Sequence, residues 1–233
     1  MHEIKRVVLV GLSGTGKSTV GQLLAAQLGW DALDVDQEIE RATTRRIPEM
    51  FASDGEAAFR VIERQHLLTA LDRSNAVIAT GGGAIIVEDA WTEDVLRRSG
   101  TVIVALDGAP ERLLARLQQQ QALDGETIER PLLAGDDPLG RFGAMQASRQ
   151  QFYDRADFTI VTDPLDAEQV AETIAGLVRP DATLPSVVLR AGGIESHIHV
   201  QSGLLDHAGS LIRARWPKAQ SATIITDANV GLL

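Results

Sequence analysis

The sequence predicts an α/β fold in which a parallel β-sheet carries helices on both faces. Two observations lead to this prediction. Short apolar runs rich in β-branched residues recur along the chain, and segments with helical periodicity lie between them. The pattern Gly-x-x-x-x-Gly-Lys-Ser, at residues 11–18, separates the first apolar run from the first helical segment. Parallel strands need a crossover connection, and a helix supplies it.

The elements follow this alternation in order. A short strand is also expected just before Leu33-Asp34. The four consecutive glutamines at 118–121 and Gly125 are taken as the end of a helix, and residues 122–140 are expected to be mobile because turn-forming Gly, Pro and Asp are frequent there. The predicted strands are 4–10, 76–79, 101–106 and 158–161, and the predicted helices are 17–28, 55–73, 110–121, 139–156 and 166–178.

Three regions are expected along the chain. Residues 1–178 form the first domain, and the proline-containing stretch 179–186 is read as a linker. The remaining residues, 187–233, are predicted to be a partial α/β appendage, too short for an ordinary independent core. Its expected elements are strands at 187–190, 197–201 and 222–226 and a helix at 204–215.

Composition narrows the partners. The formal net charge of −10 argues against nucleic acid or an anionic membrane surface, since both need a basic face. The chain has no cysteine, which excludes disulfides, thiolate metal sites and cysteine nucleophiles. The short amino-terminal apolar run lacks the features of a signal peptide, and no stretch approaches the length of a membrane span. We therefore expect a cytoplasmic protein that binds small molecules.

The glycine-rich pattern predicts a phosphate-binding loop for ATP with Mg²⁺, in a P-loop NTPase fold. Glycines let successive amides point at phosphate oxygens, and the following helix adds its positive end. Lys17 would reach the outer phosphates, and Ser18 would ligate magnesium. The competing interpretation is a chance glycine-rich turn before a helix. The expected ATP-binding residues of this loop are Gly14, Thr15, Gly16, Lys17, Ser18 and Thr19.

Further polar and glycine residues are candidates for binding the acceptor. Asp34 and Asp36 alternate after a short strand and so would share one face, although Asp36 capping a helix is an equally good interpretation. Arg60 is either a ligand-binding cation or an ordinary ion-pair partner of Glu56 or Glu63. The triple glycine 81–83 either admits a ligand close to the backbone or forms a tight turn.

Two later arginines complete this set. Arg130 lies in the expected mobile stretch, in Arg-Pro-Leu-Leu, and Arg149 stands four residues before Tyr153. One arginine closing over nucleotide phosphates and another holding an anionic substrate would suit a kinase.

Together these motifs resemble the shikimate kinase family over about residues 4–178, in order and in spacing. The resemblance implies a nucleoside-monophosphate-kinase-like fold and ATP-dependent phosphorylation of the shikimate 3-hydroxyl in the aromatic amino-acid pathway. It implies catalytic roles for Lys17, Asp36 and Arg130, with Arg130 also at ATP, and a metal site of Ser18 and, through water, Asp34. The implied substrate-binding residues are Asp36, Arg60, Glu63, Gly81, Gly82, Gly83 and Arg149.

One departure from the family concerns the adenine. Members often carry an arginine shortly before the one that matches Arg130, and another beside a proline after the last strand. No matching arginine is found in residues 118–129 or 162–166 of this sequence, so the adenine contacts are left open.

The appendage resembles the start of 3-dehydroquinate synthase, over about residues 186–233. The matching strings are His197-Ile198-His199-Val200 and Thr226-Asp227-Ala228-Asn229-Val230. This resemblance implies an inactive piece of a kinase–synthase fusion; a small accessory subdomain is the alternative. For the first domain, two alternatives are a gluconate kinase and a nucleotide-binding regulatory module that hydrolyses little ATP.

Overall fold

The computed structural model describes residues 4–124, 137–178, 186–191 and 194–199. The chain divides into two compact units, Met1–Arg179 and Pro180–Leu233, and each is described by itself. Predictions that concern Arg130, the segment 125–136 or the residues from 200 onward lie outside the described residues.

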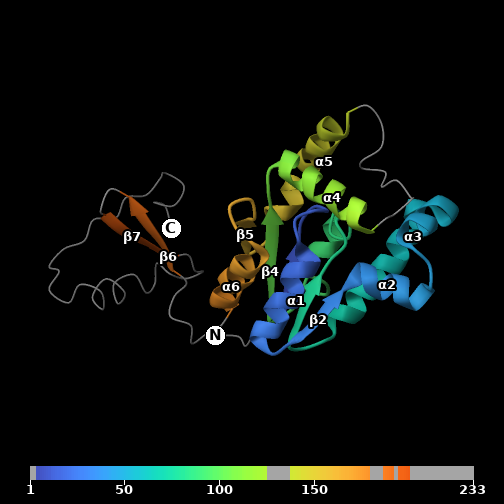
Figure 1. The fold of residues 1–233 in the computed structure, drawn as a ribbon. Coiled ribbons are helices and arrows are strands. Elements are labelled where there is room, and N and C mark those ends of the chain that lie inside the picture. Colours follow the sequence, from blue (N-terminus) through green and yellow to red (C-terminus); the bar gives the residue numbers. More distant parts are fainter. Residues whose placement is uncertain (1–3, 125–136, 179–185, 192–193, 200–233) are drawn as a thin grey trace. The chain divides into compact units, whose positions relative to one another are not determined.

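The first unit contains a five-stranded sheet whose strand order is β2-β3-β1-β4-β5 (Figure 1). Every pairing in this sheet is parallel, so the predicted α/β fold of the P-loop kinase type is confirmed. The central strand β1 is buried along its whole length, as a strand covered on both faces must be. The strands are β1 (Arg6–Val10), β2 (Asp31–Asp34), β3 (Ala76–Ala79), β4 (Thr101–Asp107) and β5 (Phe158–Val161).

Helices cover both faces of the sheet, and the side chains of β1 alternate between two cores. Val7 and Leu9 pack with α1 and α6, whereas Val8 and Val10 pack with residues of α2 to α5. The helices are α1 (Lys17–Leu28), α2 (Val35–Thr43), α3 (Ile47–Leu71), α4 (Pro110–Asp124), α5 (Pro138–Tyr153) and α6 (Ala167–Val178), with a short 3₁₀ helix, η1 (Glu88–Trp91).

Helix α1 has its predicted bounds, whereas the other four predicted helices differ at their ends. Helix α5 covers 138–153 instead of 139–156, and α6 starts one residue later than predicted. Helix α4 extends three residues beyond its predicted end, to Asp124, because glutamine is a good helix former and does not end the helix. Helix α3 begins at Ile47, eight residues earlier than predicted, with a proline in its first turn. It bends at Gly55, whose φ of 81° and ψ of 165° are not helical. The predicted start at residue 55 is therefore the bend within this helix.

The order of the strands places the ligand site. Strand β1 pairs with β3 on one side and with β4 on the other, so the chain leaves β1 at the point where the strand order reverses. Ligands of open parallel sheets bind outside the carboxyl ends of the strands at this point. The segment after β1 is the glycine-rich loop, and the segment after β3 is the triple glycine.

The second unit contains an antiparallel hairpin of β6 (Ser186–Ala191) and β7 (Ile194–His199). Its strands overlap the first two strands predicted for the appendage, although β7 starts three residues earlier than expected. The other two predicted elements lie outside the described residues. Among the helices that the structure describes, none is long and apolar enough to cross a membrane.

Candidate active site at the ends of the parallel strands

The loop after β1 has the backbone of a phosphate-binding loop. Gly11, Gly14 and Gly16 have φ angles of 137°, 85° and 90°, which other residues rarely adopt. Space is also limiting at Gly14, where a Cβ atom would lie 2.7 Å from the carbonyl oxygen of Leu113 on α4. Gly16 directly precedes α1 and offers no side-chain cap, so the first amides of the helix are available to an anion.

Lys17 is the first residue of α1, and its side chain reaches back to the backbone of this loop. Its buried Nζ donates hydrogen bonds of 2.8 Å to the carbonyl oxygens of Gly11 and of Leu12. Burial lowers the pKa of its ammonium to about 8, although nearby Asp36 and Asp34 favour the charged form. The ammonium is therefore held within the loop where phosphate oxygens would bind.

Ser18, in the first turn of α1, and Asp34, at the end of β2, bring two side-chain oxygens together. The Ser18 hydroxyl donates to Oδ2 of Asp34 at 2.5 Å, and Oδ1 of Asp34 accepts the backbone N–H of Gln37 at 3.1 Å. Magnesium is commonly held by one or two protein oxygens together with phosphates and water, so this pair fits the metal. Among the described residues, no three histidine or acidic side chains lie together as a metal-binding group.

The position of Asp36 differs from the prediction. Strand β2 ends at Asp34, so the two carboxylates do not alternate along a strand; Asp36 lies in the first turn of α2, and Asp34 is the residue that caps this helix. Both carboxylates nevertheless interact electrostatically with Lys17. Burial, together with the neighbouring carboxylates of Asp34 and Glu63, raises the pKa of Asp36 to about 7 against the opposite effect of Lys17.

Arg60 on α3 forms both of the ion pairs that the sequence offered. Its guanidinium donates to Glu63 at 2.6 Å and to Glu56 at 2.9 Å, and it lies against the rings of Phe51 and Phe59. Glu63 is buried, and burial raises the pKa of its carboxyl while Arg60 lowers it. The ion pairs therefore fix the guanidinium in one place.

The three glycines after β3 are required by close packing and not by backbone conformation. None of them has a left-handed φ. A Cβ atom on Gly81 would lie 2.3 Å from Glu63 and 2.8 Å from Asp36, and one on Gly83 would lie 2.3 Å from the Arg60 guanidinium. The segment does form a turn, since the N–H of Ala84 donates to the Gly81 carbonyl at 3.2 Å, but this turn does not itself require glycine. The close approach of the three charged side chains does.

Helix α5 contributes Arg149, as well as a residue whose role the sequence did not indicate. Nη1 of Arg149 donates to the carbonyl oxygen of Gly82 at 2.9 Å, and the Tyr153 hydroxyl donates to the same oxygen at 3.0 Å. A cavity of about 790 Å³ lies here, between α3, the glycine segment and α5. Among the residues that line it are Arg60, Glu63, Gly83 and Arg149.

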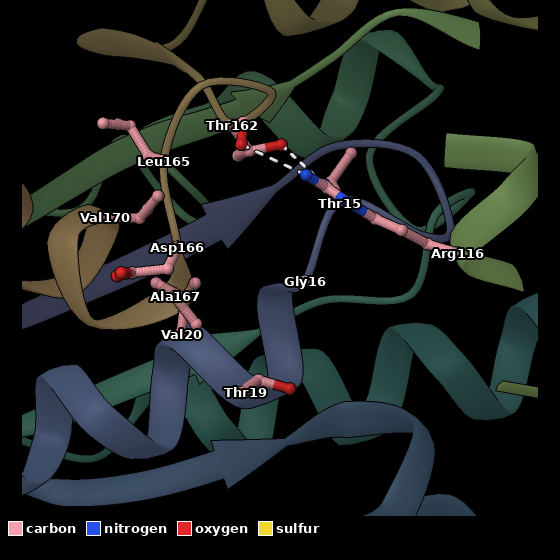
Figure 2. Close-up of a pocket in the computed structure, with 10 residues that line it drawn as sticks. All are labelled: Thr15, Gly16, Thr19, Val20, Arg116, Thr162, Leu165, Asp166, Ala167 and Val170. Atoms are coloured by element: carbon pink, nitrogen blue, oxygen red, sulfur yellow. Dashed lines mark hydrogen bonds between the residues drawn. The ribbon is translucent and has the colours of Figure 1, made fainter. Parts of the chain in front are cut away.

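A second cavity, of about 290 Å³, is lined by residues of the phosphate-binding loop, the start of α1, α4 and the start of α6 (Figure 2). Thr15, Gly16 and Thr19 line one part of it, and Arg116 and Thr162 line another. Arg116 donates from Nη1 to the Thr162 hydroxyl at 2.9 Å and from Nη2 to the Thr162 carbonyl at 3.1 Å.

Arg116 is an arginine beside the phosphate-binding loop that the sequence did not single out. It lies two residues before the stretch that was searched, in the part of α4 that packs on Gly14 of the loop. This packing is not visible in the sequence. Of the predicted site residues, Arg130 lies outside the described residues. The others lie in or beside the phosphate-binding loop or the cavity of about 790 Å³, which we call the acceptor cavity.

Comparison with known proteins agrees with this geometry. The family model described as Shikimate kinase matches residues 13–178. A shikimate kinase of Synechococcus sp. (strain RCC307) is 43% identical over 71% of this chain and 80% of the relative, and one of Thermodesulfovibrio yellowstonii is 39% identical over 73% and 93%. A solved structure of shikimate kinase from Acinetobacter baumannii in complex with shikimate superposes with a TM-score of 0.65, at 35% identity, over 73% of this chain and 90% of that chain. This chain therefore belongs to the shikimate kinase family, whose members are transferases that use ATP and Mg²⁺.

Proposed function

We propose that the described residues carry out phosphoryl transfer from ATP to the 3-hydroxyl of shikimate, with the roles given below. One observation carries the assignment. Asp36, Glu63 and Arg60 all approach the glycine segment 81–83, and the middle glycine, Gly82, lies beside Ser13 of the phosphate-binding loop. An acceptor held at these side chains would thus be adjacent to the phosphate of a nucleotide held in the loop.

On the acceptor side, Arg60 and Arg149 bind the shikimate carboxylate. Both side chains line the larger cavity, and guanidinium groups suit bidentate pairing with a carboxylate. Glu63 holds Arg60 in position through their 2.6 Å ion pair. Asp36 accepts the proton of the attacking hydroxyl, and a pKa of about 7 suits a general base at neutral pH.

On the donor side, Lys17 and the loop amides bind the phosphates, and Arg116 with Thr162 borders the space for the nucleobase and ribose. Ser18, and Asp34 through water, would hold Mg²⁺, which neutralises charge on the phosphates when bound. Lys17 stabilises the negative charge of the transferring group. Arg130 is proposed to act on the same charge; this role rests on the family motif alone.

The assignment of the carboxylate site is tested with Arg60→Ala and Arg149→Ala. Loss of a charged hydrogen-bond partner costs about 1.5–3 kcal/mol, so KM for shikimate should rise about 10- to 150-fold while KM for ATP changes less than threefold. Arg141→Ala is the matched control, because Arg141 is an exposed arginine on the same helix as Arg149. Equal increases in both KM values would refute the assignment.

We propose separately that residues 187–233 correspond to the start of a 3-dehydroquinate synthase, as in a kinase–synthase fusion, and are inactive by themselves. The support is the sequence resemblance and a hairpin where two strands are expected. On this proposal, removal of residues 180–233 leaves kcat and both KM values of the kinase within twofold of the full chain. Loss of kinase turnover in a folded truncated protein would show that the second unit belongs to the kinase.

We also infer a cytoplasmic location, supported by the absence of cysteine and by the small-molecule substrates.

A further inference from the structure

Tyr153, the last residue of α5, contacts the glycine segment of the acceptor site, and its spacing from Arg149 in the sequence assigns it no role there. Its ring is buried, with 5% of the residue exposed, and its hydroxyl lies 3.0 Å from the carbonyl oxygen of Gly82. Arg149 lies one helical turn earlier and donates to the same oxygen at 2.9 Å. Two side chains of one helix therefore share one backbone acceptor in the glycine segment.

The hydroxyl is the informative part of this side chain. Phenylalanine would fill the same space in the core, whereas a buried phenol needs a hydrogen-bond partner. The partner here is a carbonyl between Gly81 and Gly83, the two glycines that approach Asp36 and Arg60. Burial raises the pKa of the Tyr153 phenol, so the group remains a donor throughout the range in which an enzyme is assayed.

Gly82 is also in contact on a second side. A Cβ atom at this position would lie 3.4 Å from the backbone nitrogen and from the hydroxyl oxygen of Ser13 in the phosphate-binding loop. The peptide is thus set between the loop and helix α5. Fixing its carbonyl fixes the glycine segment relative to both the nucleotide side and the acceptor side of the site.

We propose that Tyr153 is a positioning residue for shikimate, which acts by sharing the Gly82 carbonyl with Arg149. The shared acceptor sets the direction of the Arg149 guanidinium, whose remaining N–H groups are available to a carboxylate in the cavity. The inference rests on the proposed function, since it requires Arg149 to bind the shikimate carboxylate. Without the phenol, Gly82 and Arg149 can shift together, and the guanidinium loses its preset direction.

The test uses Tyr153→Phe in the full chain, with steady-state kinetics for both substrates. Loss of one positioning hydrogen bond should raise KM for shikimate about three- to tenfold, and KM for ATP and kcat should stay within twofold. The shikimate methyl ester is the diagnostic substrate. It lacks the carboxylate charge, so Tyr153→Phe and the wild type should then have equal KM values.

The control is Thr173→Val, which removes a hydroxyl that donates to the Gln169 carbonyl on α6, away from the acceptor cavity. It should leave both KM values unchanged. Equal KM for shikimate in Tyr153→Phe and the wild type would overturn the inference, as would a similar penalty for the ester or a parallel rise in KM for ATP. Arg149→Ala distinguishes failure of the proposed function from failure of this inference. If Arg149→Ala leaves KM for shikimate unchanged, the proposed carboxylate site is refuted. If Arg149→Ala raises KM for shikimate but Tyr153→Phe does not, only the positioning role of Tyr153 is refuted.

Discussion

Gly83→Ala is expected to lower kcat/KM for shikimate sharply through one added methyl group. The ideal Cβ position on Gly83 lies 2.3 Å from Nη2 of Arg60 and 2.6 Å from its Cζ, well inside the usual contact distance. The backbone of Gly83 is not left-handed, so alanine brings no conformational strain at this position. The group that must move is the Arg60 guanidinium, by about 1 Å to restore an ordinary contact.

Arg60 cannot make that movement without loss. Its guanidinium is held by the buried Glu63 at 2.6 Å and by Glu56 at 2.9 Å, so displacing it weakens the ion pairs that orient it. A misplacement of about 1 Å in a positioning group can cost on the order of 100-fold in rate. We therefore expect kcat/KM for shikimate to fall about 30- to 100-fold, with KM for ATP within threefold of the wild type.

The assay combines steady-state kinetics with thermal unfolding. The displaced atoms are the end of a flexible side chain at a cavity wall, so the free energy of unfolding should change by less than about 1 kcal/mol. Gly82→Ala is the graded comparison, since its nearest contact is 3.4 Å, and it should lose much less activity. Gly143→Ala on α5, with no atom within 4 Å of the added group, controls for the substitution itself. Wild-type kcat/KM in Gly83→Ala would refute the steric argument.

Three further predictions concern the base, the nucleotide and the metal. With a pKa of about 7 for Asp36 and about 8 for Lys17, kcat/KM for shikimate should rise with pH through about 7 and fall above about 8, and Asp36→Asn should lose activity. The pKa of Asp36 in the folded protein lies above the ordinary 3.8, so ionisation of Asp36 lowers the free energy of unfolding as pH rises from about 4 to about 7. Asp36→Asn should therefore have a higher Tm than the wild type at pH 8, and the difference should vanish near pH 4. Arg116→Ala should raise KM for ATP about 5- to 20-fold without changing KM for shikimate, and an unchanged KM for ATP would remove Arg116 from the nucleotide site. Ser18→Ala should raise the Mg²⁺ concentration needed for half-maximal rate at least tenfold, whereas an unaltered magnesium dependence would argue against Ser18 as a ligand.

The sequence predicts the parts of this protein that depend on local chemistry. The phosphate-binding loop is such a part, because its left-handed glycines, its lysine and its helix start all lie within residues 11–18. The strands β3 and β5 have the bounds that their apolar runs predict. The triple glycine could be identified as unusual from the sequence. That the close approach of side chains, and not the turn, requires glycine there follows only from the positions of Arg60 and Glu63.

Features that depend on packing between distant elements were not predictable. The predicted alternation of Asp34 and Asp36 was wrong for a local reason: strand β2 ends at Asp34 and helix α2 begins at Val35, so the two side chains do not lie along one strand. The other two cases depend on distant elements. Arg116 reaches the nucleotide cavity only because α4 packs on the loop. Tyr153 has the pattern of a core residue, and only its contact with Gly82, 71 positions earlier in the sequence, indicates another role.

One coupled assay measures directly whether this chain transfers a phosphoryl group from ATP to shikimate. ADP release is measured with ATP and either shikimate or gluconate, each with and without Mg²⁺. We expect ADP release that requires both shikimate and Mg²⁺, with no more than background release in the presence of gluconate. ATP binding without shikimate-dependent turnover, or equal turnover with gluconate, would contradict it.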